Sequence, residues 1–128
     1  MTDEELYELA CSARERAYAP YSGFSVGAAL LAKSGNVYLG CNIENRAFSP
    51  SNCAERTAFF KAVSDGERSF VKLAVAGGKA GESPVFCPPC GVCRQVIAEF
   101  CAGDFPIVLG EGATIRTYLL RDLLPHAF

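Results

Sequence analysis

The chain has 128 residues, of which 50% are hydrophobic and 20% charged, and 14 acidic side chains outnumber 12 basic ones. A chain of this length buries roughly two thirds of its unfolded surface, so we expect residues 1–128 to form a single domain. The net charge of -2 argues against nucleic acid as a partner, because proteins that bind phosphate backbones carry a basic excess. No apolar run approaches the roughly 20 residues that span a bilayer, and the acidic start is unlike a signal peptide. We therefore expect a cytoplasmic protein that binds no membrane.

The first part of the chain predicts a helix followed by a β-hairpin. Apolar residues recur at helical spacing from Thr2 to Ala17, and Thr2 with Glu5 has the form of a capping box that begins this helix. Two short apolar runs, 25–32 and 36–42, are separated by a Lys-Ser-Gly turn. Such a pair of runs indicates two antiparallel strands.

Helices and strands alternate in the rest of the chain. The predicted elements are a helix at 53–63, a buried strand at 70–76, a helix at 89–101, a strand at 105–109 and a strand or short helix at 114–124. This alternation is typical of a mainly parallel or mixed sheet with helices packed on it. The fold class is therefore expected to be α/β.

Seven cysteines are the most unusual feature of the composition. An odd number of cysteines in a chain without an export signal does not indicate a disulfide framework. In a cytosolic protein, clustered cysteines more often bind metal or take part in chemistry. Cys11, Cys41 and Cys101 lie outside any cluster, and we expect them to be buried thiols with no chemical role.

Metal-ligating residues gather at the predicted starts of two helices. Cys53 begins one helix, and Cys90 and Cys93 lie three residues apart in the first turn of the other, where their sulfurs share a face. Helix N-termini carry partial positive charge, which favours the thiolate form that a metal needs. Three thiolates suit tetrahedral zinc and leave the fourth position for water, which distinguishes a catalytic site from a structural one. The sequence therefore predicts one Zn²⁺ per subunit.

A second pair of cysteines overlaps this set, because Cys87 also lies three residues before Cys90. Two consecutive prolines, Pro88 and Pro89, hold the chain extended between them, and neither is compatible with the middle of a helix. Pro89 is compatible with the first helical turn, which places Cys90 and Cys93 inside that turn. We therefore interpret Cys87 as a bystander. The only histidine, His126, is expected on the surface of the tail.

Five motifs in chain order resemble those of the small, homotetrameric, zinc-dependent cytidine deaminases. They are Pro-Tyr-Ser-x-Phe at 20–24, Cys-Asn-Ile-Glu-Asn at 41–45, Cys-Ala-Glu-Arg-Thr-Ala at 53–58, Pro-Cys-Gly-Val-Cys-Arg-Gln at 89–95 and Leu-Leu-Pro-x-x-Phe at 123–128. A ligand-x-Glu element followed by Pro-Cys-x-x-Cys is the signature of zinc deaminases. The resemblance covers nearly the whole chain. It implies a three-layer α/β/α fold with a mixed, roughly five-stranded central sheet, and a homotetramer.

The resemblance also implies roles for the residues around the metal. Zinc lowers the pKa of a bound water, which then attacks C4 of the cytosine ring. Glu55 is not a ligand; it would take the proton of that water, pass it to ring N3 and later help protonate the departing amine. Three thiolates give Zn²⁺ a net charge of about -1, and Arg56 would offset it by hydrogen-bonding the ligand sulfurs.

Substrate contacts are carried over from the same resemblance. Asn42 and Glu44 are alternate residues near a strand end and point to one face, where an amide and a carboxylate can clamp the ribose 3′-hydroxyl. Phe24 would stack on the pyrimidine, and Ala54 would also contact substrate. The terminal Phe128 would cover the active site of a neighbouring subunit.

One position departs from the family. Phe48 stands where many relatives carry tyrosine, in a loop that reaches an adjacent subunit's site. Its ring can still pack there, but it can make no hydrogen bond.

Three functions compete at this point. The expected one is hydrolytic deamination of cytidine and 2′-deoxycytidine to uridine and 2′-deoxyuridine with release of ammonia, in pyrimidine salvage. The second keeps the chemistry but takes blasticidin S, a nucleotide or a polynucleotide. The third is a structural zinc module, which would require a fourth ligand such as Cys87 and would leave Glu55 without a role.

Overall fold

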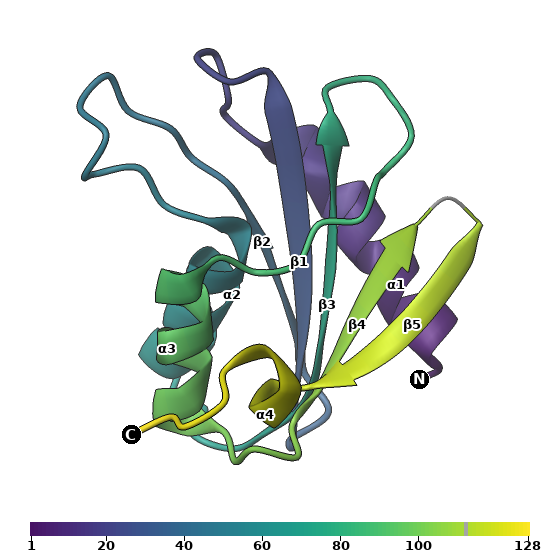
Figure 1. Ribbon diagram of the computed structural model, residues 1–128, viewed down its shortest axis with the longest axis vertical. Coiled ribbons are helices and arrows are strands. Elements are labelled where there is room, and N and C mark those ends of the chain that lie inside the picture. The colour runs from purple at the N-terminus through teal and green to yellow at the C-terminus, as the bar shows by residue number, and fades with distance from the viewer. Residues whose placement is uncertain (112) are drawn as a thin grey trace.

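The computed structural model describes residues 1–111 and 113–128, and its centre is a five-stranded sheet with the strand order β2-β1-β3-β4-β5 (Figure 1). The strands are β1 (Phe24–Ala32), β2 (Val37–Cys41), β3 (Phe70–Lys79), β4 (Pro106–Glu111) and β5 (Thr114–Leu119). The predicted hairpin is confirmed, because β1 and β2 pair antiparallel with Leu30 opposite Tyr38. No helix in the described part of the chain is long and apolar enough to cross a membrane.

The sheet is mixed rather than mainly parallel. β1 pairs antiparallel with β3, and β4 pairs antiparallel with β5. The one parallel pair is β3 with β4, which are joined by the crossover that contains α3 (Gly91–Phe100). A parallel pair requires such a crossover connection, whereas the short turns of β1–β2 and β4–β5 allow antiparallel neighbours. Of the two arrangements left open by the sequence, the mixed sheet is therefore the one that forms.

The N-terminal helix is shorter than its periodicity predicts. α1 (Asp3–Ala13) begins with the predicted capping box, in which Thr2 and Glu5 each accept from the other's backbone N–H. After Ala13 the chain forms one turn of 3₁₀ helix and becomes extended at Ala17. The extended backbone at Ala17 lets the next residue, Tyr18, form a β-bridge with Ile43. The helical spacing of apolar residues in the sequence therefore continues for about one turn beyond the end of the α-helix.

Helices cover both faces of the sheet and make three layers, as expected (Figure 1). α2 (Ala54–Ser64) and α3 lie on one face, and α1 lies on the other. Leu73 and Val75 of β3 point into the core shared with α2 and α3, whereas the alternate residues Ala74 and Ala76 point into the core shared with α1. The strand is therefore buried on both faces, which explains its continuous apolar run.

The C-terminal segment, which the sequence left as strand or short helix, is both. β5 runs to Leu119, and α4 (Leu120–Leu123) follows at once. The two elements have different neighbours: β5 pairs with β4, while α4 packs beside α3. A single strand or helix periodicity therefore does not describe the whole 114–124 segment.

Gly40 sets the distance between β2 and α2, and thus the place of the site described below. A Cβ at Gly40 would lie 2.2 Å from the carbonyl oxygen of Ala54 and 2.6 Å from the amide nitrogen of Ala58, both backbone atoms of α2. We expect Gly40→Ala to lower the free energy of unfolding in urea by about 1–3 kcal/mol, because the helix must move away from the strand.

Gly91→Ala is the control for this substitution, because nothing lies within 4 Å of a Cβ built at Gly91. We expect its free energy of unfolding to stay within about 1 kcal/mol of the parent value, since alanine is the better helix former. Equal unfolding free energies for the two variants would contradict the close approach of α2 to β2.

Candidate metal centre and active site

The first residues of α2 and α3 bring the predicted metal ligands together. Cys53 is the N-cap of α2 and Cys90 is the N-cap of α3, each with extended backbone angles and neither with a side-chain capping bond. Neither sulfur therefore hydrogen-bonds to the backbone amides at the start of its own helix. Cys93 lies in the first turn of α3 and is fully buried. The sequence predicted Cys90 inside the first turn as well. Cys90 is instead the N-cap, one position before that turn, because the extended backbone of the proline segment continues through it.

The three sulfurs have the spacing of a zinc site. The sulfurs of Cys53, Cys90 and Cys93 all lie within 4.8 Å of one another, and no other such group of three or more potential ligands occurs in the described part of the chain. Tetrahedral Zn²⁺ with Zn–S bonds of about 2.3 Å would place its sulfurs roughly 3.8 Å apart. The distance between the sulfurs of Cys53 and Cys90 is 3.7 Å. The donor set and its spacing therefore fit zinc with one position open.

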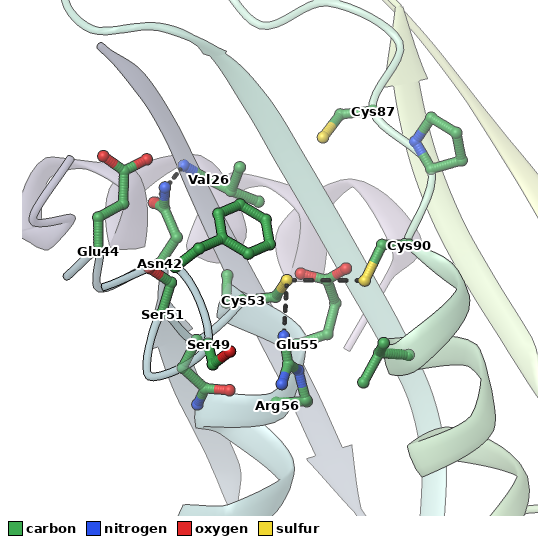
Figure 2. A pocket seen from close by; sticks show the side chains of 15 residues that line it. Val26, Asn42, Glu44, Ser49, Ser51, Cys53, Glu55, Arg56, Cys87 and Cys90 are labelled. Atoms are coloured by element: carbon green, nitrogen blue, oxygen red, sulfur yellow. Dashed lines mark hydrogen bonds between the residues drawn. The ribbon is translucent and has the colours of Figure 1, made fainter. Parts of the chain in front are cut away.

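Hydrogen bonds favour negative charge on one sulfur of this group, that of Cys53. A hydrogen bond with Cys93 and a second with Arg56 lower the pKa of Cys53, whereas the bond to Cys53, followed by burial, raises the pKa of Cys93. The Nη2 atom of Arg56 donates to the sulfur of Cys53 over 3.2 Å. Figure 2 shows this guanidinium below the Cys53 sulfur and the Cys90 sulfur to its side. A cation therefore touches the ligand set directly.

Glu55 is the buried acid of the site. It is only 4% exposed, and its carboxylate lies beside the sulfurs of Cys53 and Cys90 (Figure 2). Burial raises the pKa of Glu55 to about 7, because a charged carboxylate loses its hydration there. A carboxyl group with a pKa near neutrality can both accept and donate a proton at physiological pH.

A cavity of about 510 Å³ opens above these residues. It is lined by Val26, Asn42, Glu44, Phe48, Ser49, Ser51, Asn52, Cys53, Ala54, Glu55, Arg56, Cys87, Pro88, Cys90 and Val92. A volume of this size is within the range of small-molecule sites. Among the predicted substrate contacts, Asn42, Glu44 and Ala54 therefore line the cavity, whereas Phe24 and Phe128 do not.

Asn42 and Glu44 are held by short hydrogen bonds to the backbone of neighbouring segments. The Oδ1 atom of Asn42 accepts from the amide of Val26 over 2.8 Å, and its Nδ2 atom donates to the carbonyl of Phe24 over 2.9 Å. Glu44 accepts from the amides of Tyr21 and Ser22 on Oε1 and from the Ser22 hydroxyl on Oε2. These bonds lower the pKa of Glu44, so it is ionised at neutral pH.

The two aromatic side chains expected to reach neighbouring subunits are exposed. Phe128 is fully exposed and Phe48 is 91% exposed. Phe24 is not one of these exposed side chains. Its ring lies over Gly77 of β3, where the sulfur of Cys87 also lies.

The remaining cysteines differ in part from their predicted places. Cys87 lines the cavity but is not in the sulfur group, and burial raises its pKa to about 11. Cys11, Cys41 and Cys101 were expected to be buried, but each is only partly buried. Cys11 and Cys101 pack at the margins of the two cores, whereas the Cys41 thiol donates to the carbonyl of Arg16.

Some residues at the cavity were not predicted from the sequence. Ser49 and Ser51 line the cavity and lie in no motif, whereas Val92, which lines it, and Ser22, which holds Glu44, lie in motifs but were given no role. Serine and valine are common in loops and helix turns, so only their position in the folded chain distinguishes them. The serine of the Pro-Tyr-Ser motif was the one available pointer to Ser22.

Comparisons with known proteins agree with this geometry. Residues 1–109 match the family described as the cytidine and deoxycytidylate deaminase zinc-binding region. The chain is 57% identical over 129 residues to cytidine deaminase from Sporosarcina psychrophila, covering 100% of this chain and 92% of the relative. It is 50% identical to cytidine deaminase from Halalkalibacterium halodurans, covering 100% and 95%. The crystal structure of cytidine deaminase from Burkholderia pseudomallei superimposes with a TM-score of 0.91 at 45% identity, covering 100% of both chains.

A zinc-binding site at the starts of two helices on a mixed sheet thus defines a metal-dependent hydrolase. The chain belongs to the cytidine and deoxycytidylate deaminase family. The predicted family, α/β fold, enzyme class and zinc cofactor are confirmed.

Proposed function

We propose that this chain hydrolyses the 4-amino group of cytidine and 2′-deoxycytidine, giving uridine and 2′-deoxyuridine with ammonia. The observation that carries the proposal is a buried carboxyl group beside three zinc-compatible sulfurs at the wall of one cavity. A structural zinc module is not supported, because Cys87 is outside the sulfur group and Glu55 would have no reason to be buried there.

The roles of the residues at the reacting atoms follow from their chemistry. Cys53, Cys90 and Cys93 would hold Zn²⁺, which when bound supplies a Lewis acid and an acidified water. Glu55 accepts a proton from that water and delivers it to N3 of the pyrimidine. It would later move the remaining proton, from the hydroxyl then on C4, to the amine as the C4–N bond breaks, so that one water is consumed and one ammonia released. The burial of Glu55 keeps this proton away from bulk solvent.

Arg56 is proposed to offset the charge of the ligand set. Three thiolates around a divalent cation carry a net charge of about -1, which reduces its strength as a Lewis acid. The guanidinium bond to Cys53 withdraws charge from that sulfur. Arginine suits this position because it remains protonated beside a carboxyl group and two thiols.

Asn42 and Glu44 are proposed to bind the sugar with the hydrogen-bonding capacity that their internal contacts leave free. A carboxylate offers about four acceptor directions, and Glu44 uses two on Oε1 and one on Oε2. The Asn42 amide has used one of its two N–H groups. One free N–H and one free acceptor direction match a ribose hydroxyl, which accepts from the first and donates to the second. Ala54 and Phe24 complete the proposed substrate set.

The assembly and location are part of the same proposal. We propose a cytoplasmic homotetramer of single-domain chains that acts in pyrimidine salvage. Phe48 and Phe128 support it, because a large aromatic side chain that is almost fully exposed gains free energy when another surface covers it.

Removal of the terminal ring tests the proposed role of Phe128 in a neighbouring site. We expect Phe128→Ala to lower kcat/KM for cytidine roughly ten- to hundredfold, since burying a phenyl ring is worth about 1.5–3 kcal/mol. The fold of the subunit, checked by circular dichroism, should not change, because the side chain is fully exposed in its own chain. Light scattering on the same samples measures the assembly. An unchanged kcat/KM in a tetramer would contradict the role of the ring.

A direct assay tests the proposed function. The purified, zinc-loaded chain is mixed with cytidine, 2′-deoxycytidine, cytidine monophosphate or blasticidin S, and loss of the cytosine absorbance band is followed. Turnover of the two nucleosides with little turnover of the other compounds supports the proposal. A chain that carries one zinc and deaminates only blasticidin S or the nucleotide would overturn it in favour of the altered substrate.

A further inference from the structure

One arginine outside the cavity connects the metal-binding turn to the C-terminal segment. The Nε atom of Arg94 donates to the carbonyl of Pro89 over 2.7 Å, and its Nη1 atom donates to the carbonyl of Leu123 over 2.6 Å. Its backbone amide donates to the carbonyl of Cys90 over 3.0 Å. Arg94 therefore hydrogen-bonds to both residues of the peptide bond that leads into Cys90, namely Pro89 and Cys90 itself.

The segment before Cys90 needs a donor from elsewhere. Pro88 and Pro89 carry no backbone N–H, so the turn has few donors of its own, and Pro89 is buried. Cys90 itself is exposed and has no side-chain capping bond. The direction of its sulfur therefore depends on how firmly the backbone at Pro89 is held, and the guanidinium of Arg94 is what holds it.

The other end of the contact lies at the start of the tail. Leu123 is the last residue of α4, and α4 packs beside α3. α4 is a single short turn, held by the amide of Leu124 donating to Leu120. A charge-assisted bond of 2.6 Å to Leu123 is a strong restraint on so short an element.

We infer that Arg94 is a positioning residue that holds the Cys90 end of the metal site and couples it to the C-terminal tail. The inference rests on the proposed function, because it concerns the zinc ligands and the segment that carries Phe128. Lysine cannot replace arginine here, since a single ammonium group does not offer two donors in a rigid fork to two separate carbonyls.

Zinc release tests the inference without relying on catalysis. Zinc-loaded protein is mixed with an excess of a chromogenic chelator, and the rate of colour formation is measured. We expect Arg94→Ala to release zinc roughly tenfold faster than the parent, the lower end of the range for lost contacts behind metal ligands. Arg94→Lys should stay close to the alanine variant and, because it retains charge and bulk, serves if Arg94→Ala fails to fold.

Arg68 provides the matched control. Its guanidinium also donates to two backbone carbonyls, those of Val63 and Glu67, at the opposite end of α2 from Cys53. Arg68→Ala should release zinc at the parent rate. In hydrogen exchange, Arg94→Ala should expose both the 85–93 segment and the 120–128 segment, whereas Arg68→Ala should expose neither.

The outcomes separate this inference from the proposed function. If the parent deaminates cytidine but Arg94→Ala and Arg68→Ala release zinc equally fast, Arg94 has no positioning role. Faster exchange in 120–128 alone, with unchanged zinc release, also overturns the inference, because the contact then supports only the tail. A parent that binds zinc and turns over no nucleoside overturns the proposed function, while the comparison of zinc release still decides the role of Arg94.

Discussion

Replacing Glu55 by glutamine should lower the rate of cytidine deamination by about a hundred- to ten-thousandfold, the contribution expected of a group that transfers protons at the reacting atoms. Glutamine has the same shape but cannot accept or release a proton. The variant should bind one zinc per chain, because the sulfur group does not include Glu55. Its thermal stability should not fall, since a neutral amide avoids the cost of burying a charged carboxylate.

The measurement needs activity, zinc content and melting temperature from the same preparation. Glu99→Gln is the matched control, because Glu99 is an exposed glutamate on α3 and should leave all three quantities unchanged. A Glu55→Gln variant with more than a tenth of the parent rate would refute the proton-transfer role. A variant without zinc would show instead that Glu55 supports the metal site.

Replacing any one of Cys53, Cys90 and Cys93 by alanine should remove both zinc and activity. Two sulfurs cannot close the coordination of a tetrahedral site that already leaves one position to water. The sulfurs lie within 4.8 Å of one another, so each belongs to the same site and no single loss can be replaced from a second one. Zinc content by mass spectrometry of the native chain, together with the cytidine assay, checks the expectation.

Cys87→Ala is the control that distinguishes the two overlapping cysteine pairs. Cys87 lines the cavity beside Pro88 but is outside the sulfur group, and its raised pKa keeps it as a thiol. The variant should keep its zinc and most of its activity. Loss of zinc from Cys87→Ala, with retention in Cys90→Ala or Cys93→Ala, would contradict the proposed ligand set.

Local patterns along the chain were sufficient for most of the fold. The capping box at Thr2, the hairpin at 25–42 and the buried run that begins at Phe70 each depend on residues within a few positions of one another. Such patterns report local preferences and the face that must be buried. Where two environments meet within one segment, as at 114–124, the pattern was ambiguous because half of it pairs with a strand and half packs on a helix.

Residue chemistry in the linear chain, with the family resemblance, was likewise sufficient to predict the metal and the family, and to propose Glu55 as the acid. Cysteines at helix starts, a glutamate two residues after the first and prolines before the second all act within one or two turns, so their order carries the information. Thiolate donors restrict the metal to soft ions such as zinc, and the family resemblance selects zinc among them.

Contacts between distant segments are what the folded chain alone establishes. Three features depend on how α2 and α3 pack on the sheet. They are the 3.7 Å distance between the sulfurs of Cys53 and Cys90, the burial of Glu55 and the close approach of α2 to Gly40. The bond from Arg94 to Leu123 joins two segments that local preference cannot relate. Distances of this kind come from long-range packing, because no short stretch of sequence encodes the position of a partner that is distant in the chain.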